Sequence, residues 1–147
     1  MNEIKKQLVQ LLNQALKLEH AARVQYLSHA ECIQGNGAEP VISRLKEIAS
    51  DEKEHEDMFR NLIGGYLGGI PTMEFGETGH AEERKTILEI NLNKEKEAID
   101  LYKNIYQKVI ENKAELPYSF ERLEHDIRHI VVDEQEHVSE LSLLLGI

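Results

Sequence analysis

Asp51-Glu52-Lys53-Glu54-His55 recurs 82 positions later as Asp133-Glu134-Gln135-Glu136-His137, and this repeat indicates how the chain folds. In both copies a histidine follows a glutamate by three residues. Three residues of α-helix turn through about 300°, so the two side chains share one face, one turn apart. The repeat therefore predicts two helices that each present a carboxylate and an imidazole on the same side.

A partner segment precedes each copy of this stretch. Residues 19–26 and 95–102 can be laid over each other, and three pairs of residues match. The matching pairs are Glu19 with Glu95, Ala22 with Ala98, and Tyr26 with Tyr102. The chain is thus a duplicated unit, in which a helix with one glutamate precedes a helix with Glu-x-x-His. Four carboxylates and two imidazoles on four helices are the inventory of a dinuclear metal site.

Composition limits the class of protein. With 147 residues, 41% of them hydrophobic and 30% charged, we expect a single helical domain over residues 1–147. The formal net charge of −10 disfavours nucleic acid as a partner and favours attraction of cations. We expect no membrane span, because no run of about 18 apolar residues occurs. A single cysteine, Cys32, and an N-terminus without a signal-peptide pattern favour the cytoplasm.

Apolar residues recur at intervals of three and four, which predicts long helices over about 4–33, 40–63, 81–111 and 120–144. Residues 64–79 contain six glycines and one proline, which argues against regular helix there. That segment is long enough to cross the height of a bundle. The expected fold is all-α: an antiparallel four-helix bundle, with a long crossover between the second and third helices.

The metal-site residues are expected to meet at one depth. Glu19 lies 17 residues before the turn at position 36 and Glu52 lies 16 residues after it. At about 1.5 Å per residue, their carboxylates reach nearly the same level. Glu95 and Glu134 lie 21 residues before and 18 residues after the turn near position 116, a rough match.

Glu134 and His137 are the sharpest local anomaly, because they occupy inward positions of a helix whose other inward residues are large and apolar. Four buried carboxylates without counter-charge would cost many kcal/mol, whereas two divalent cations cancel their charge. The competing interpretation is a bundle whose buried acids pair with lysine or arginine. Oxygen and nitrogen ligands without a thiolate suit iron or manganese, and the ligands alone do not distinguish the two.

On these motifs the chain resembles the ferritin-like superfamily, most of all its bacterioferritin and rubrerythrin branch, over all four helices. The resemblance implies two terminal glutamates, one per metal, two glutamates that bridge both metals, and two histidines that each hold one. In that order, these metal ligands are Glu19 and Glu95, Glu52 and Glu134, and His55 and His137. The bridging pair would also be the catalytic pair.

The resemblance assigns supporting roles to four further residues. Asp51 and Asp133 match acids that orient the histidine of the opposite Glu-x-x-His helix. Tyr26 and Tyr102 match tyrosines that hydrogen-bond near the metals, and they fit equally well as core aromatics. Ordinary exposed helix acids and core tyrosines are the alternative interpretations.

Three departures from the branch matter for function. Lys53 replaces the methionine that binds haem in bacterioferritin, so we expect no haem. Ala98 replaces an extra glutamate of rubrerythrins, and no Cys-x-x-Cys domain is present, which argues against a rubrerythrin-type peroxidase. Only ten residues follow His137, too few for the fifth helix of 24-subunit cages, so we expect a monomer or homodimer.

The expected function is that of a non-haem dinuclear iron protein that oxidises Fe(II) with O₂ or hydrogen peroxide, as a ferroxidase or peroxidase. Manganese also fits the ligand set. Two alternatives stay open: an oxygenase or hydroxylase acting on an organic substrate, and a protein that binds metal without catalysis. An apolar cavity that reaches the metals would favour the oxygenase.

Other histidines carry weaker signals. His125 and His129 lie four residues apart and can bind a surface metal, although solvated helix histidines are the ordinary interpretation. His20, Gln25 and His29 are expected at the helix surface or the bundle edge.

Overall fold

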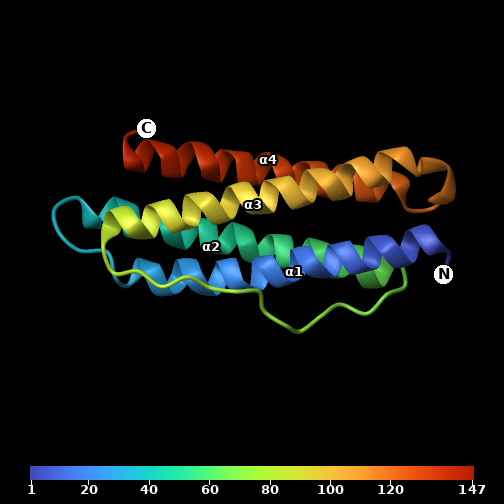
Figure 1. Ribbon diagram of the computed structural model, residues 1–147, viewed down its shortest axis with the longest axis horizontal. Coiled ribbons are helices and arrows are strands. Elements are labelled where there is room, and N and C mark those ends of the chain that lie inside the picture. Colours follow the sequence, from blue (N-terminus) through green and yellow to red (C-terminus); the bar gives the residue numbers. More distant parts are fainter.

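The fold is described by a computed structural model that covers residues 1–147. Four long helices account for most of the chain, and no strand is present: α1 (Glu3–Ala30), α2 (Ala38–Arg60), α3 (Arg84–Glu111) and α4 (Phe120–Leu145). In Figure 1, α1 and α2 form one antiparallel pair, and α3 and α4 form a second pair beside it. This arrangement confirms the predicted all-α four-helix bundle.

The helix boundaries follow local signals. Asn2 caps α1, because its side chain accepts a hydrogen bond from the backbone N–H of Lys5 at 2.8 Å. The turn that follows α1 contains Gly35 and Gly37 at φ values of 91° and 73°, a conformation that favours glycine. Because this turn starts early, α1 ends at residue 30 and not at the predicted 33. Helix α3 begins at residue 84, three residues after the predicted start.

The prediction that helix would stop near residue 63 was wrong. Helix α2 continues as a π-helix, η1 (Asn61–Tyr66), which includes Gly64 and Gly65. A glycine inside a helix costs about 1 kcal/mol relative to alanine. Leu62 and Ile63 are fully buried here, and burying one such side chain contributes about 1.5–3 kcal/mol, so packing outweighs propensity.

The irregular crossover at residues 67–83 lies against α1. Figure 1 shows it running the length of the bundle from the end of η1 to the start of α3. The Gly76 N–H donates to the Lys17 carbonyl at 2.9 Å, and the Thr72 N–H donates to Oδ1 of Asn13 at 2.8 Å. A side chain at Gly69 would meet the methyl groups of Val9 at 2.7 Å. The crossover therefore covers the outer face of α1 at these positions.

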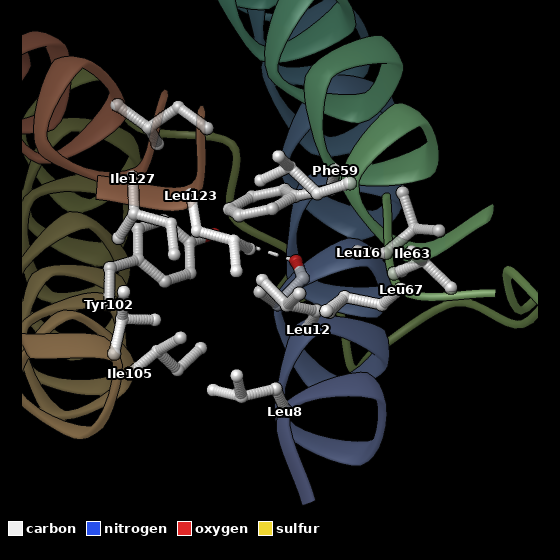
Figure 2. Packing of buried hydrophobic residues seen from close by; sticks show 14 of the residues in the cluster. Leu8, Leu12, Leu16, Phe59, Ile63, Leu67, Tyr102, Ile105, Leu123 and Ile127 are labelled. Atoms are coloured by element: carbon white, nitrogen blue, oxygen red, sulfur yellow. Dashed lines mark hydrogen bonds between the residues drawn. The ribbon is translucent and has the colours of Figure 1, made fainter. Parts of the chain in front are cut away.

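Two apolar clusters fill the bundle, one towards each end. The larger one has 16 buried residues and the smaller one has 12. Figure 2 shows residues of the larger cluster converging from all four helices. Within it the rings of Phe59 and Tyr102 meet edge to face, with centroids 5.3 Å apart. The two clusters leave a layer between them, and the polar residues described below occupy that layer.

The buried faces differ in detail from the predicted apolar stripes. In α1 the apolar stripe spaced by three and four residues runs through Leu11 and Leu18, but these two are only partly buried, whereas Leu12 and Leu16 are fully buried. This helix contacts α2, α3 and the crossover, so its buried face is wider than a single stripe. In α4, Leu144 is 36% exposed because it lies in the last turn of the helix. No helix in the bundle has the length and apolar character that crossing a membrane requires.

Candidate metal centre

The structure brings the six predicted ligands together as two groups of four. In each group the ligand atoms lie within 4.8 Å of one another. The first group is Glu19, Glu52, His55 and Glu134, and the second is Glu52, Glu95, Glu134 and His137. Glu52 and Glu134 belong to both groups. Two ions that share two carboxylates need this arrangement.

All six side chains lie in the layer between the two apolar clusters. Each is at most 2% exposed, and every helix contributes at least one of them. Each glutamate follows a buried apolar turn of its helix, as Glu134 follows Ile130 by four residues. Helix periodicity therefore directs the carboxylates inwards together with the leucines and isoleucines.

The two histidines point their Nδ1 atoms at the carboxylates. Nδ1 of His55 lies 2.9 Å from Glu134, 3.5 Å from Glu19 and 3.6 Å from Glu52. Nδ1 of His137 lies 3.4–3.6 Å from three carboxylate oxygens of the second group. Atoms bound to one metal at about 2.1 Å lie roughly 3–3.5 Å apart, so the observed separations are close to those expected for ligands of one ion.

The Nε2 atoms of the two histidines face outwards to aspartates of the opposite half. Nε2 of His55 donates to Oδ2 of Asp133 at 2.9 Å, and Nε2 of His137 donates to Oδ2 of Asp51 at 2.8 Å. These contacts fix both rings so that Nδ1 faces the centre. An N–H donated to a carboxylate in this way is the usual support of a metal-bound histidine.

Two tyrosines hold the terminal glutamates in the same crossed manner. The Tyr26 hydroxyl donates to Oε1 of Glu95 at 2.7 Å, and the Tyr102 hydroxyl donates to Oε1 of Glu19 at 2.8 Å. Burial raises the pKa of both hydroxyls well above 10, and the neighbouring carboxylates raise it further. Both tyrosines therefore stay protonated, and Oε2 of each glutamate stays buried without a hydrogen-bond partner.

Burial and crowding shift the pKa values of three carboxylates in the centre, those of Glu52, Glu95 and Glu134. Burial raises the pKa of Glu52 and of Glu134, and the other carboxylates raise it further. Burial also acts to raise the pKa of Glu95, but hydrogen bonds with Glu134, His137 and Tyr26 outweigh it and lower that pKa. Without metal, the centre therefore retains protons on some carboxylates.

The surrounding carboxylates favour the charged form of both imidazoles. Burial acts to lower the pKa of His55, but contacts with Asp133, Glu134 and Glu19 raise it to about 12. Burial likewise acts to lower the pKa of His137, whereas its carboxylate neighbours raise it. Protons on these rings balance part of the negative charge of the glutamates, which metal ions would otherwise balance.

Unpaired buried atoms test whether the centre fits a metal. Nine buried side-chain nitrogen and oxygen atoms lack a hydrogen-bond partner in the whole chain, and seven of them belong to these six residues. They are Glu19 Oε2, Glu52 Oε1, His55 Nδ1, Glu95 Oε2, both oxygens of Glu134, and His137 Nδ1. Buried polar atoms normally have partners. Seven ligand-type atoms aimed at one place fit two metal ions.

A narrow pocket between α1 and α3 reaches this centre. Its volume is about 30 Å³, and its lining includes Glu52, Glu95 and Glu134 at the inner end. The exposed residues Glu77 and Glu97 contribute to the outer end. One water needs at least about 10–15 Å³, so this pocket holds about two molecules of that size. Small ions and diatomic molecules therefore have a path from the surface to the centre.

His20, which was expected at the helix surface or the bundle edge, is buried beneath the crossover. His20 is 4% exposed, and its Nδ1 donates to the Glu74 carbonyl of the crossover at 2.7 Å. Beside it, buried Glu56 pairs with Arg23 and Arg60. Glu56 is thus a buried acid paired with arginine, as the competing interpretation predicts, but it lies outside the six-residue centre.

Gln25 and His29, which were also expected at the helix surface or the bundle edge, are buried as well. Asn91 links them, because it accepts from Gln25 at 2.8 Å and its amide contacts Nδ1 of His29 at 2.9 Å. Gln25 also accepts the Gly79 N–H at 2.6 Å. The crossover covers these residues, and no periodic signal in the sequence reveals that cover. By contrast, His125 and His129 lie exposed on α4, as expected.

Comparison with known proteins identifies the family to which this chain belongs. The family model described as a ferritin-like domain matches residues 9–146. The chain therefore belongs to the ferritin-like family, and its carboxylate and histidine cluster is able to bind metal. A search of curated proteins found no match.

Solved structures share the fold over nearly the whole chain. A ferritin-like diiron-carboxylate protein from Bacillus anthracis is 26% identical, with 99% of each chain covered and a TM-score of 0.89. Rhodobacter capsulatus bacterioferritin, solved with a metal-free dinuclear site and haem iron, is 22% identical, covers 96% of this chain and 84% of its own, and has a TM-score of 0.84. A dodecameric thioferritin from Bacteroides fragilis is 24% identical, with 97% and 86% covered and a TM-score of 0.82. The last two show similarity of fold.

Proposed function

We propose that this protein holds two iron ions at the six-residue centre and oxidises Fe(II) with O₂ or hydrogen peroxide. The observation that carries the proposal is the sharing of Glu52 and Glu134 by two four-ligand groups. The diiron-carboxylate description of the Bacillus anthracis relative supports iron as the metal. Manganese fits the same oxygen and nitrogen donors, so the metal is part of what must be tested.

Each side chain has a defined task in this proposal. Glu19 and Glu95 would each hold one ion, while Glu52 and Glu134, which belong to both groups, would hold both. His55 and His137 bind through the Nδ1 atoms that have no hydrogen-bond partner. When bound, the iron pair supplies the electrons that reduce the oxidant.

The surrounding residues hold these ligands in place. Asp51 and Asp133 keep the Nε2 protons on the outer side of the rings, so that Nδ1 remains a lone-pair donor once metal displaces its proton. Tyr26 and Tyr102 hold one oxygen of each terminal glutamate. The apolar clusters above and below exclude water and strengthen the attraction between carboxylates and cations.

The size of the pocket favours a small oxidant over an organic substrate. About 30 Å³ accommodates O₂, hydrogen peroxide or a single metal ion. Sites for organic ligands of drug size usually have volumes of about 300–1,000 Å³. This difference supports the ferroxidase or peroxidase function over the oxygenase alternative.

Anaerobic Fe(II) titration followed by a pulse of O₂ or hydrogen peroxide tests the proposal. We expect two Fe(II) ions per chain, followed by a fast rise in ferric absorbance after the pulse. The His55→Ala variant should show a slower and smaller rise. Metal analysis of protein purified without added metal identifies iron or manganese. Two bound ions without faster oxidation than free Fe(II) would favour metal binding without catalysis.

The same proposal includes a cytoplasmic location, which the single cysteine favours, and a monomeric or homodimeric state. Size-exclusion chromatography with light scattering measures the oligomeric state. A dodecamer or a larger shell would contradict the monomer or homodimer.

A further inference from the structure

The outer face of α4 carries two histidines that the buried centre does not use. His125 and His129 are four residues apart, their rings are parallel to within 7°, and the ring centroids lie 6.3 Å apart. Their side chains are 59% and 53% exposed. Residues at i and i+4 share a helix face, and this spacing allows two histidines to bind one metal ion.

A carboxylate lies beside one nitrogen of each ring. Nδ1 of His125 donates to Oδ1 of Asp126 at 2.9 Å, and Nε2 of His129 lies 3.4 Å from Oδ2 of Asp133. The second nitrogen of each ring, Nε2 of His125 and Nδ1 of His129, remains free to bind a metal. The two buried histidines have the same pairing with carboxylates. The surface pair therefore repeats the support that metal-bound histidines typically have.

We propose that His125 and His129 bind a divalent transition-metal ion on the outside of α4, at a site separate from the buried centre. With metal–nitrogen distances of about 2.1 Å, two imidazoles on one ion have ring centroids roughly 5–6.5 Å apart. The observed separation of 6.3 Å needs only rotation of exposed side chains. Imidazole donors select zinc, copper, nickel and iron over magnesium or calcium.

The neighbouring arginines do not oppose a cation here, because acids neutralise them. Nε of Arg128 donates to Glu124 at 2.7 Å, and Arg122 lies 3.4 Å from Asp126. The chain as a whole carries a formal charge of −10, which raises the local concentration of cations.

Asp133 joins the surface site to the buried centre. Its Oδ2 accepts the hydrogen bond from His55 and also faces His129. The first half of the duplicated chain has no such pair, because Ser43 and Glu47 occupy the equivalent positions. An ion held by His129 would therefore be linked through Asp133 to the buried group that contains His55, and to that group only.

Equilibrium dialysis against Ni(II) tests the site. The wild-type protein should bind one more Ni(II) per chain than the H125A/H129A variant. His80→Ala is the matched control, because His80 is exposed and lies outside α4, and it should bind as much Ni(II) as the wild type. Equal Ni(II) content in the wild type and the double variant would overturn the proposal.

A second measurement separates this site from the proposed function. His129→Gln alone should weaken retention on a nickel-chelate resin and raise the Kd of the surface Ni(II) at least tenfold. Thermal melting should be unchanged, because the side chain is exposed. The H125A/H129A variant should still bind two Fe(II) ions anaerobically, whereas Glu134→Ala should lose those ions and keep the surface Ni(II). Unchanged resin retention of the His129→Gln variant would also contradict the surface site.

Discussion

Asp51 on α2 accepts a hydrogen bond from Nε2 of His137 on α4 at 2.8 Å, although 86 residues separate them in the chain. The mirror contact joins Asp133 on α4 to His55 on α2. Both tyrosine contacts also cross between the two halves of the duplicated chain. Neither half can thus support its own candidate ligands, and the centre depends on docking of the two helix pairs.

This crossed support predicts which metal each aspartate affects. Asp133→Asn should weaken the ion held by His55, and Asp51→Asn should weaken the ion held by His137. The loss in affinity should be about 10–100-fold in each case, because a neutral amide oxygen accepts the Nε2–H bond more weakly than a carboxylate does. Anaerobic Co(II) titration, followed by the visible absorbance of the bound ions, measures both steps. Glu136→Gln is the control, because this exposed residue lies on α4 and should leave both steps unchanged. Equal loss of both ions in Asp133→Asn would contradict the crossed assignment.

Shared and unshared ligands should differ in how many metals they affect. Glu52→Ala and Glu134→Ala should each reduce the binding of both ions, because the two groups share these carboxylates. His55→Ala should mainly weaken one ion. Metal analysis after anaerobic loading and desalting measures the stoichiometry. Two ions retained by the Glu134→Ala protein would show that this residue does not bridge.

Haem should be absent in stoichiometric amounts. Lys53, which directly follows Glu52, is exposed and offers a charged ammonium group in place of a sulfur ligand. The purified protein should therefore show no Soret band, and a pyridine haemochrome assay should detect no haem. A Soret band equivalent to one haem per two chains would contradict this prediction.

Removing the metals should make stability fall as pH rises. The pKa values of Glu52 and Glu134 are raised above 4.5, that of His137 is raised above 6.5, and that of His55 is raised to about 12. Between its unfolded and folded pKa values, each of these groups binds more protons in the folded chain. Their stabilising contribution is therefore present at low pH and is lost as pH climbs through the folded values. Glu95 and Asp133 have lowered pKa values and act in the opposite sense only below about pH 4.5.

Thermal melts of chelator-treated protein check this sign. The Tm should be higher at pH 5 than at pH 8, and metal at pH 8 should raise it. A ligand at 100 times its Kd adds about 2.7 kcal/mol to the free energy of unfolding. An apo Tm that climbs steadily from pH 5 to pH 8 would indicate carboxylates paired with cationic side chains in place of a metal centre.

The sequence alone was sufficient to predict the helices and the six converging residues. Glu134 and His137 stand out because they interrupt an apolar heptad, and helix geometry then requires them to face the core. Counting residues from the turns placed Glu19 and Glu52 at one depth, and the structure puts them in one group. These predictions rest on the helical period and on the duplication, which can both be recognised in the sequence without knowledge of the fold.

Only the tertiary structure decided what covers α1 and how the halves cross. The crossover at 67–83 has no periodic pattern of apolar residues, so nothing in the sequence indicates that it buries His20, Gln25 and His29. The π-helix after α2 was also unforeseen, because burial of Leu62 and Ile63 outweighs the preference of glycine for turns. The narrow pocket between α1 and α3 likewise depends on side chains from distant helices. Long-range packing determines these features, and the residue pattern of a single helix does not show which surface will pack against it.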